Sequence, residues 1–375
     1  MTPESFVLHF RITKSCNANC SYCSSAMVEK LDAMTPFEAR QSALNVIKYW
    51  EQVGVSPKYL TIEYVGGEVT MLPLEKLTEI VTSVRDVFSA HGVNVHDGVQ
   101  SNLIAPKRKL EALYELFDGR MGTSIDNFTS QRKIGSSSTR YRKKLNESLE
   151  HFHSIKGKIL PAVLTIDANN KAFISDEYKI ANQDGRDLVI RPVFQGGSTV
   201  ELVSQKELLG IYTNVFEEWF MKGNISVEPL SSLLKKRIDT LNGKSEQGNY
   251  CSWQSDCIRN SLSIEPNGDA FVCQELADHD FGLLGNTITG EYDHAIMRKL
   301  GRRSVKIAKQ CGNCTYFNDC QGGCMMHAIE KGLTEYDKTP YCETWKALFS
   351  LLDININKHS ATEISNWMTS NEKQS

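Results

Sequence analysis

The chain lacks any apolar run near the roughly 20 residues that a helix needs to cross a bilayer. Residues 1–10 lack the basic start and long apolar core of a secretory signal. Positive charge is not in excess, because 42 basic and 45 acidic residues leave a net charge of −3. Nothing in that balance favours binding to nucleic acid. We therefore expect a cytoplasmic protein with no membrane partner and no nucleic-acid partner.

Internal repeats and low-complexity tracts are also missing, which excludes solenoids and long disordered linkers. The 375 residues suffice for one large α/β domain and a smaller unit, and 41% of them are hydrophobic. A chain without an export signal stays in a reducing compartment, where disulfides are not expected. Its 11 cysteines are therefore better interpreted as metal ligands.

The cysteines divide into three plus eight. The first three follow a short apolar segment with C-x3-C-x2-C spacing, and the other eight lie in the last third of the chain: Cys16, Cys20, Cys23; Cys251, Cys257, Cys273, Cys311, Cys314, Cys320, Cys324, Cys342. A [4Fe–4S] cluster normally takes four thiolates. Eight cysteines suit two closed clusters, and three suit a cluster with one open iron that can bind a ligand. This division predicts an enzyme, with structural zinc sites as the alternative.

Strand-like and helix-like segments alternate over the first half of the chain. Thr35 and Glu38 form a capping box around Pro36, which predicts a helix start there. Further helices are expected at 74–88 and 141–153. Strands are expected at 6–12, 59–65, 93–101, 121–125, 159–166 and 188–194. About six βα units predict a parallel sheet curled into a partial barrel, since a complete eightfold barrel usually needs about 250 residues.

The second half changes character at Cys251, where cysteine and turn residues become frequent. We expect a helix at 205–221 and a hairpin of strands 261–264 and 270–272 around the Pro266-Asn267-Gly268-Asp269 turn. A closing helix is expected at 345–356, and the tail after His359 is expected to fray. The predicted division is a partial barrel at 1–222, a connector with one helix at 223–250, a metal-held domain at 251–342 and a C-terminal helix and tail at 343–375.

The N-terminal motif, with Tyr22 between Cys20 and Cys23, resembles the radical S-adenosylmethionine (SAM) superfamily. The resemblance implies a partial (β/α)6 barrel whose first strand is followed by the cysteine loop. It implies that Cys16, Cys20 and Cys23 hold three irons of a [4Fe–4S] cluster, while SAM chelates the fourth. Reduction of that cluster would cleave SAM to methionine and a 5′-deoxyadenosyl radical.

Further strand ends support this resemblance and predict contacts with SAM. Gly66 and Gly67 would permit a close approach of the backbone to SAM, and the Glu68 carboxylate suits the SAM ammonium group. Tyr22 is expected near the adenine, and Arg132 is expected near the SAM carboxylate. Ordinary turns, strand-end capping, loop packing or a surface position are the alternatives. The predicted SAM contacts are Tyr22, Gly66, Gly67, Glu68, Gln100, Asn102, Ser124, Asp126 and Arg132.

The C-terminal spacing C-x2-C-x5-C-x3-C, followed by one more cysteine, closely resembles the SPASM domain of radical SAM peptide-modifying enzymes. The resemblance implies two auxiliary [4Fe–4S] clusters with interleaved ligands, and so three clusters in all. The nearer cluster would use Cys251, Cys257, Cys273 and Cys324. The farther cluster would use Cys311, Cys314, Cys320 and Cys342.

The layout is similar to anaerobic sulfatase-maturating enzymes and to enzymes that crosslink ribosomal peptides, with one departure. After the third SPASM cysteine the sulfatase enzymes carry an aspartate that accepts the substrate proton, whereas Gln274 follows Cys273 here. An amide cannot act as that base. We therefore favour an oxidative change, such as a cyclophane, carbon–carbon or ether crosslink, on a ribosomal peptide. Formylglycine formation, small-molecule chemistry and electron transfer without catalysis remain alternatives. Glu275, Asp278 and His279 are the candidate bases, with Glu275 first.

The resemblance also implies partners. A precursor peptide would be the substrate, and a flavodoxin or ferredoxin would supply electrons. Because only five residues precede the first expected strand, we expect no N-terminal recognition domain on this chain. The barrel mouth, the connector or a separate peptide-recognition protein would then hold the peptide.

Overall fold

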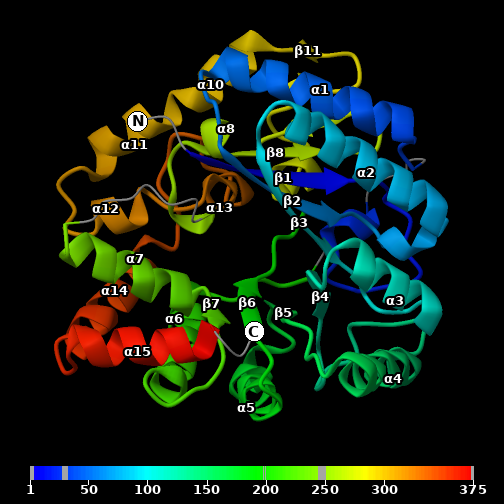
Figure 1. The fold of residues 1–375 in the computed structure, drawn as a ribbon. Helices are drawn as coiled ribbons and strands as arrows, with labels where there is room; N and C mark the ends of the chain where they lie inside the picture. The colour runs from blue at the N-terminus through cyan, green and yellow to red at the C-terminus, as the bar shows by residue number, and fades with distance from the viewer. Residues whose placement is uncertain (1–3, 28–32, 197, 199, 244–250, 373–375) are drawn as a thin grey trace.

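The computed structural model describes residues 4–27, 33–196, 198, 200–243 and 251–372, and they form one curled sheet with helices around it (Figure 1). The sheet has 11 strands in the order β11-β10-β9-β8-β1-β2-β3-β4-β5-β6-β7. Strands β1 to β7 run parallel in sequence order. Because β11 and β7 lie at the two ends of this order, the barrel is open, as the sequence predicted.

The elements have the following bounds. The strands are β1 (Ser5–Arg11), β2 (Tyr59–Val65), β3 (Asn94–Gln100), β4 (Met121–Ser124), β5 (Ala162–Ile166), β6 (Leu188–Pro192), β7 (Val227–Glu228), β8 (Ser261–Ile264), β9 (Asp269–Phe271), β10 (Gly285–Asn286) and β11 (Glu291–Tyr292). The α-helices are α1 (Pro36–Val53), α2 (Leu74–Ala90), α3 (Lys107–Leu116), α4 (Ser138–Lys156), α5 (Ile174–Asp184), α6 (Gln205–Trp219), α7 (Leu230–Leu241), α8 (Cys257–Asn260), α9 (Gln274–Asp278), α10 (His294–Gly301), α11 (Arg303–Cys311), α12 (Phe317–Cys320), α13 (Met325–Glu330), α14 (Cys342–Ile356) and α15 (Ala361–Glu372). The 3-10 turns are η1 (Ser24–Met27), η2 (Val69–Met71), η3 (Lys171–Phe173) and η4 (Cys251–Trp253).

Local sequence signals explain the barrel elements. The capping box at Thr35 forms as predicted, with the Thr35 hydroxyl accepting from the Glu38 amide and the Glu38 carboxylate accepting from the Thr35 amide. Alternate residues of β1 are fully buried against the outer helices. Phe6 packs its ring 5.5 Å from that of Trp50 on α1, which lies 5.4 Å from Phe88 on α2. This aromatic contact fixes the two helices on the outside and leaves the other face of β1 toward the barrel interior.

The cysteine-rich part is joined to the barrel through the sheet itself. Strand β8 pairs in parallel with β1, with Leu8 opposite Leu262, and β9 returns antiparallel as the predicted hairpin. The sheet therefore continues across the boundary predicted at Cys251. The division into domains stays a prediction, and the part of the predicted connector at 244–250 lies outside the described residues.

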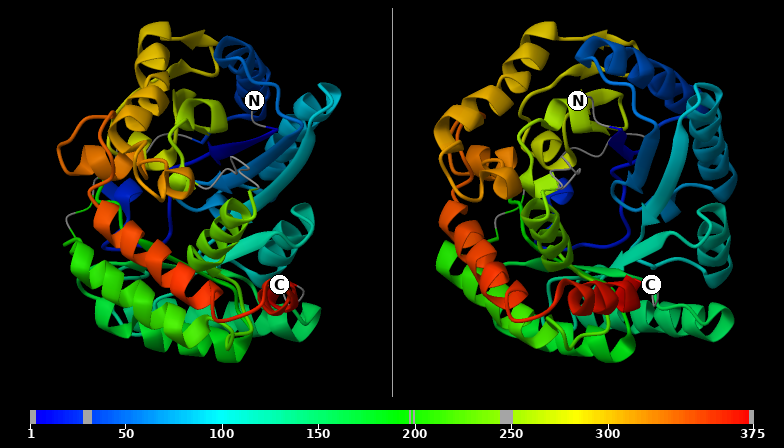
Figure 2. Two further views of the ribbon diagram at one scale, coloured as in Figure 1. Left: turned by 90° about the vertical axis from the view of Figure 1, so that its left-hand side faces the viewer. Right: turned by 60° about the vertical axis from the view of Figure 1, so that its left-hand side comes forward.

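The C-terminal tail differs from expectation. Residues 361–372 form helix α15, which lies beside α6 (Figure 2). Trp367 packs 4.8 Å from Trp219, centroid to centroid, and its indole N–H donates to the Gly223 carbonyl at 2.9 Å. The prediction that the tail frays is therefore wrong. Trp367, 8 residues beyond His359, makes an aromatic contact that offsets the entropy lost when the tail becomes ordered.

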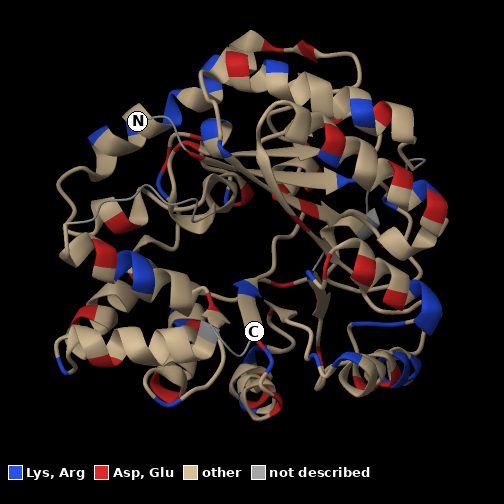
Figure 3. Ribbon diagram, viewed as in Figure 1, with Lys and Arg blue, Asp and Glu red and all other residues tan. Residues whose placement is uncertain are grey.

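Acidic and basic residues are interspersed over most of the outer helices, whereas α10 and α11 carry basic residues and no acidic one (Figure 3). Within the described residues, no helix is both long and apolar enough to span a bilayer.

Candidate active site

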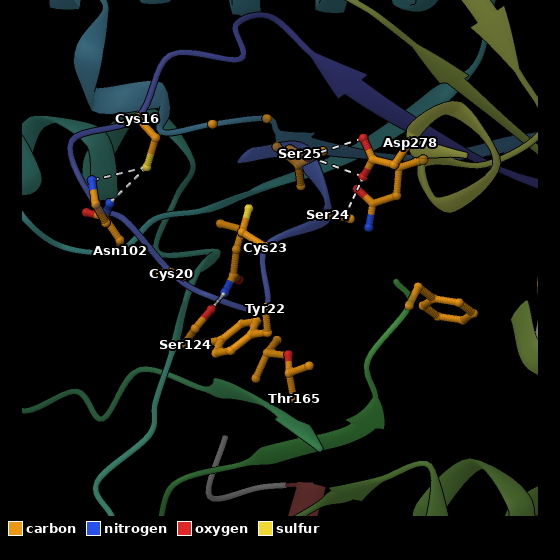
Figure 4. A pocket seen from close by; sticks show the side chains of 18 of the residues that line it. Cys16, Cys20, Tyr22, Cys23, Ser24, Ser25, Asn102, Ser124, Thr165 and Asp278 are labelled. Carbon is orange, nitrogen blue, oxygen red and sulfur yellow. Dashed lines mark hydrogen bonds between the residues drawn. The ribbon is translucent and has the colours of Figure 1, made fainter. Parts of the chain in front are cut away.

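The three N-terminal cysteines lie on the loop between β1 and η1, at the carboxyl end of the first strand. Backbone bonds hold this loop in place: the Asn19 amide donates to the Lys133 carbonyl at 2.8 Å, and the Ser21 amide donates to the Gln131 carbonyl at 3.0 Å. Asn102 donates a side-chain N–H to the Cys16 sulfur at 3.7 Å, as Figure 4 shows. The cysteine loop is thus held from two later strand ends.

The glycine pair after β2 lies against the cysteine loop. A Cβ on Gly66 would come within 2.2 Å of the Thr13 carbonyl oxygen, and one on Gly67 within 2.1 Å of the Ser15 carbonyl oxygen. Gly66 also has a φ of +146°, which disfavours a side chain. The amides of Gly67 and Glu68 donate to these two carbonyls at 2.8 Å each. The glycines therefore permit a close approach to the cysteine loop, although we predicted an approach to the ligand.

Glu68 is 2% exposed and is held by the next strand end. Its carboxylate accepts from the Ser101 hydroxyl at 2.8 Å, from the Asn102 amide at 2.7 Å and from the Thr70 amide at 3.1 Å. A carboxylate offers about four lone-pair sites, so one further donor can be accepted. Glu68 borders the same cavity as the three cysteines. This geometry suits a fixed acceptor for an ammonium group.

Arg132 is buried and faces two tyrosines. One guanidinium nitrogen donates to the Tyr22 hydroxyl at 2.6 Å, and the other donates to the Tyr141 hydroxyl. Within the described residues Arg132 forms no ion pair with a carboxylate, and its Nε has no hydrogen-bond partner. Burial raises the pKa of Tyr22, so that hydroxyl cannot serve as the counter-anion. A buried cation without an anion favours an anionic ligand beside it.

These groups line one cavity of about 280 Å³. Figure 4 shows its cysteines and the polar side chains at the ends of β3, β4 and β5. Eight of the nine predicted SAM contacts border it: Tyr22, Gly66, Gly67, Glu68, Gln100, Asn102, Ser124 and Arg132. Gln100 is positioned by donating to the Thr123 carbonyl at 2.6 Å and to the Ser124 hydroxyl at 3.1 Å.

Asp126 is the exception. It is not among the residues that border the cavity. Its carboxylate accepts from the amide of Thr129 at 2.9 Å and from the Thr129 hydroxyl, so it caps the loop that leads to Arg132. The prediction that Asp126 contacts SAM has no support from this position, because a short acidic side chain after a strand caps the turn as readily as it meets a ligand.

The other side of the cavity comes from the cysteine-rich part and includes Asp278, one of the candidate bases. Asp278 is engaged by Arg11 at 2.8 Å and accepts from the Ser24 hydroxyl at 2.6 Å, as Figure 4 shows. Arg11 also pairs with Glu265 at 3.0 Å, and Lys14 pairs with Glu265 at 2.5 Å. This buried network ties β1 and the residues after Cys23 to the cysteine-rich part. These contacts fix the orientation of the Asp278 carboxylate.

Glu275 and Gln274 border the cavity as well, and His279 does not. Burial raises the pKa of Glu275, but Arg191, His9 and a hydrogen bond from Gln274 outweigh it and lower that pKa. The Gln274 amide donates to Glu275 at 3.1 Å, and the Arg191 guanidinium lies 3.4 Å from the same oxygen. Of the three candidate bases, only Glu275 is both at the cavity and free of a short ion pair.

The sequence motifs did not predict the charged residues that lie inside the barrel. Arg11, Glu63 and Arg191 border the cavity, and His9 lies 3.5 Å from Glu63. Each stands at an alternate position of a strand whose other face is apolar. Period-two alternation of charge within buried strands is the signal that would have indicated them.

Cys251, Cys257, Cys273 and Cys324 approach one another in the folded chain. Burial raises the pKa of Cys273 well above its ordinary value, and Glu275, Cys324 and Cys251 add to this rise. Burial likewise raises the pKa of Cys324 to about 12, with Cys257 among the neighbours that add to it. Four thiols that oppose each other's ionisation need a cation to become thiolates.

Cys311, Cys314, Cys320 and Cys342 form a second group around a cavity of about 140 Å³. Burial raises the pKa of Cys320 to about 12, and Cys342, Cys311 and Cys314 all contribute to the rise. The two groupings coincide with the two interleaved ligand sets that the sequence resemblance implies.

No disulfide joins any of the 11 cysteines, all of which lie within the described residues. In the part of the chain that the structure describes, no three His, Cys, Asp or Glu side chains converge on a position for a single metal ion. In an iron–sulfur cluster each thiolate binds a different iron, so its sulfurs surround a volume and do not meet at one point. The two auxiliary clusters stay a prediction from the sequence resemblance, with tetrahedral zinc sites as the alternative.

Solved structures show the same fold. Native anSMEcpe with bound AdoMet and Cp18Cys peptide aligns with a TM-score of 0.72 at 17% identity, over 94% of this chain and 99% of that chain. Streptococcus suis SuiB bound to precursor peptide SuiA aligns with a TM-score of 0.56 at 15% identity, over 90% of this chain and 76% of that chain. The fold is that of radical SAM enzymes, with a cysteine-rich C-terminal region.

Sequence relatives narrow the class. Mycofactocin maturase MftC of Mycobacterium ulcerans is 24% identical over 351 residues, which cover 89% of this chain and 87% of the relative. The serine-type anaerobic sulfatase-maturating enzyme of Klebsiella aerogenes is 20% identical, over 86% of this chain and 80% of the relative. No protein-family model matches the chain. The curated relatives of this chain are therefore maturases, and its fold is similar to that of enzymes solved with bound AdoMet or S-adenosylmethionine.

Proposed function

We propose that this enzyme installs an oxidative crosslink on a ribosomally made peptide. One observation supports the proposal most strongly. A single cavity is bordered on one side by the cysteine loop and on the other by Gln274 and Glu275 of the cysteine-rich part. A peptide residue seated between them would lie next to both the site of radical formation and the candidate base.

The barrel side of the cavity supplies a complete set of SAM contacts in this proposal. Cys16, Cys20 and Cys23 would hold the iron–sulfur cluster. Glu68 would accept the SAM ammonium group, and the buried guanidinium of Arg132 would meet the SAM carboxylate. The cluster, when reduced and bound to SAM, supplies a 5′-deoxyadenosyl radical that can take a hydrogen atom from the peptide.

The redox balance then defines the product. The peptide loses one hydrogen atom to the deoxyadenosyl group, forms a bond to an acceptor within the same peptide, and releases one proton and one electron. One electron enters at SAM cleavage and one leaves at bond formation, so SAM is the net oxidant. The two C-terminal groups of four cysteines would hold auxiliary clusters that receive the departing electron. A flavodoxin or ferredoxin is the proposed reductant.

A peptide substrate is supported by the similar structures, since anSMEcpe and SuiB both hold peptides. The charged interior residues Glu63 and Arg191 are about half exposed and border the cavity. They are available to bind polar groups of a peptide in the barrel.

Mass spectrometry of the product tests the proposal. We expect the peptide encoded beside this chain's gene to become lighter by two hydrogen atoms, with one 5′-deoxyadenosine formed per event. Synthetic sulfatase peptides with cysteine or serine at the target position should yield no aldehyde, because Gln274 replaces the acidic base. Efficient formation of formylglycine would replace crosslinking with sulfatase maturation as the function.

The proposal also predicts the effect of removing the Glu275 carboxylate. General bases typically contribute about 10²–10⁴-fold in rate, so Glu275→Gln should slow crosslink formation by that order while SAM cleavage continues. His279→Gln is a matched control, because His279 is exposed and lies outside the cavity. Equal crosslinking rates in the two variants would remove Glu275 from the reaction.

A further inference from the structure

Arg303, the first residue of α11, is a buried cation with no carboxylate partner among the described residues. Its side chain is 1% exposed. Within the described residues it forms no ion pair with any carboxylate, and its Nε has no hydrogen-bond partner. Arg237 shows how a buried arginine is usually compensated by carboxylates: it pairs with Asp319 at 2.8 Å and with Asp353 at 2.6 Å. A lone guanidinium in such a site costs several kcal/mol unless other charge compensates it, by the usual penalty for a buried ion.

Backbone carbonyls hold the Arg303 guanidinium in one orientation. It donates to the carbonyl of Gly323 at 2.9 Å, to that of Asp337 at 2.9 Å, and to that of Glu335. Gly323 directly precedes Cys324, a proposed ligand of the nearer cluster. Carbonyl dipoles reduce the cost of burial, but they provide no formal negative charge.

Both groups of cysteines lie around this guanidinium. Burial lowers the pKa of Arg303, and the thiols of Cys257, Cys324 and Cys311 oppose that change. Cys257 and Cys324 belong to the nearer group, whereas Cys311 belongs to the farther one. The carboxylate of Asp337 acts on Arg303 more weakly than these thiols do, and it accepts from the Thr334 amide at 2.9 Å. The geometry agrees, because the Gly323 carbonyl that accepts from Arg303 lies in the chain between Gly322, which borders the cavity of the farther group, and Cys324 of the nearer group.

We infer that Arg303 is a positioning and redox-tuning residue shared by the two auxiliary clusters, whose negative charge is its missing counter-ion. The inference rests on the proposed function, because it requires the clusters. Four thiolates give a [4Fe–4S] cluster a net negative charge that increases by one on reduction. A fixed cation nearby stabilises the reduced form more than the oxidised form, so it raises the reduction potential. Raised potentials suit clusters that must accept an electron from the peptide.

Redox titration followed by electron paramagnetic resonance tests this inference in the full chain. The Cys16→Ala/Cys20→Ala/Cys23→Ala variant serves as background, so that only the auxiliary clusters give signals. On that background Arg303→Gln removes the charge but keeps a hydrogen-bond donor. We expect the equilibrium constant for reducing at least one auxiliary cluster to fall by about tenfold, or about 59 mV for a one-electron couple. Arg303→Lys should restore the potential. Arg302→Gln is the matched control, because its side chain is exposed and solvent screens its charge.

The outcomes separate this inference from the proposed function. A background variant without two four-iron clusters would contradict the proposed function itself. Two intact clusters with unchanged potentials in Arg303→Gln would overturn only the role of Arg303. Loss of iron in Arg303→Gln but not in Arg303→Lys supports a role for the charge. Loss of iron in both variants would assign Arg303 to holding the carbonyls and would also overturn the inference.

Discussion

Replacing Cys16, Cys20 and Cys23 with alanine is expected to leave about eight irons of about twelve and to abolish SAM cleavage, as three [4Fe–4S] clusters require. The three thiols lie on one loop at the cavity, and the other eight cysteines form separate groups elsewhere. Replacing the three N-terminal cysteines should therefore leave the iron bound by the other eight cysteines in place. Iron and sulfide analysis of protein isolated without oxygen measures the first effect, and chromatography of 5′-deoxyadenosine after addition of dithionite and SAM measures the second.

The control for this variant is the wild-type chain carried through the same preparation. Circular dichroism should show the same helix content in both, because the loop is held by backbone bonds that do not involve the thiols. Stoichiometric zinc without labile sulfide in the wild-type chain would contradict the three-cluster interpretation. Residual SAM cleavage at the wild-type rate would remove the three cysteines from the reaction.

Cys320→Ala should give the reciprocal result, SAM cleavage without a crosslinked peptide. Cys320 borders the 140 Å³ cavity with Cys311, Cys314 and Cys342, so its loss removes one thiolate from the proposed farther cluster. Folding of a metal-held region is coupled to its metal, and the variant should also unfold at a lower temperature. Radical formation needs only the N-terminal cluster and should persist. Parallel assays for deoxyadenosine and for the lighter peptide separate the two steps.

The Cys16→Ala/Cys20→Ala/Cys23→Ala variant is the comparison for Cys320→Ala. Both should lose about four irons, but only the triple variant should lose SAM cleavage. Full crosslinking by soluble Cys320→Ala would exclude the farther cluster as an electron acceptor. Loss of SAM cleavage together with crosslinking, in protein that keeps the N-terminal cluster, would indicate that the two regions depend on each other for folding.

Sequence patterns predicted the elements of the barrel closely, because each signal acts over a few residues. Strand β2 coincides with the predicted 59–65, and the capping box at Thr35 marks the start of α1. The tail was misjudged, because helix α15 depends on a contact between Trp367 and Trp219 far away in sequence. The SAM contact of Asp126 stays a prediction, because its residue type suits both a ligand contact and a local cap, and its carboxylate accepts from the Thr129 amide here.

The sequence by itself determined which reactive groups the protein carries. Cysteine number and spacing indicated three iron–sulfur sites, and Gln274 stands where the sulfatase-maturating enzymes carry an acidic base. The tertiary structure alone decided which groups meet. It paired β8 with β1 and thereby placed Glu275 on the same cavity as Cys16. It engaged Asp278 with Arg11 and left Arg132 and Arg303 buried without carboxylate partners in the described part of the chain. Spacing specifies a ligand set within one loop, but charge compensation depends on residues more than 200 positions apart, which only packing brings together.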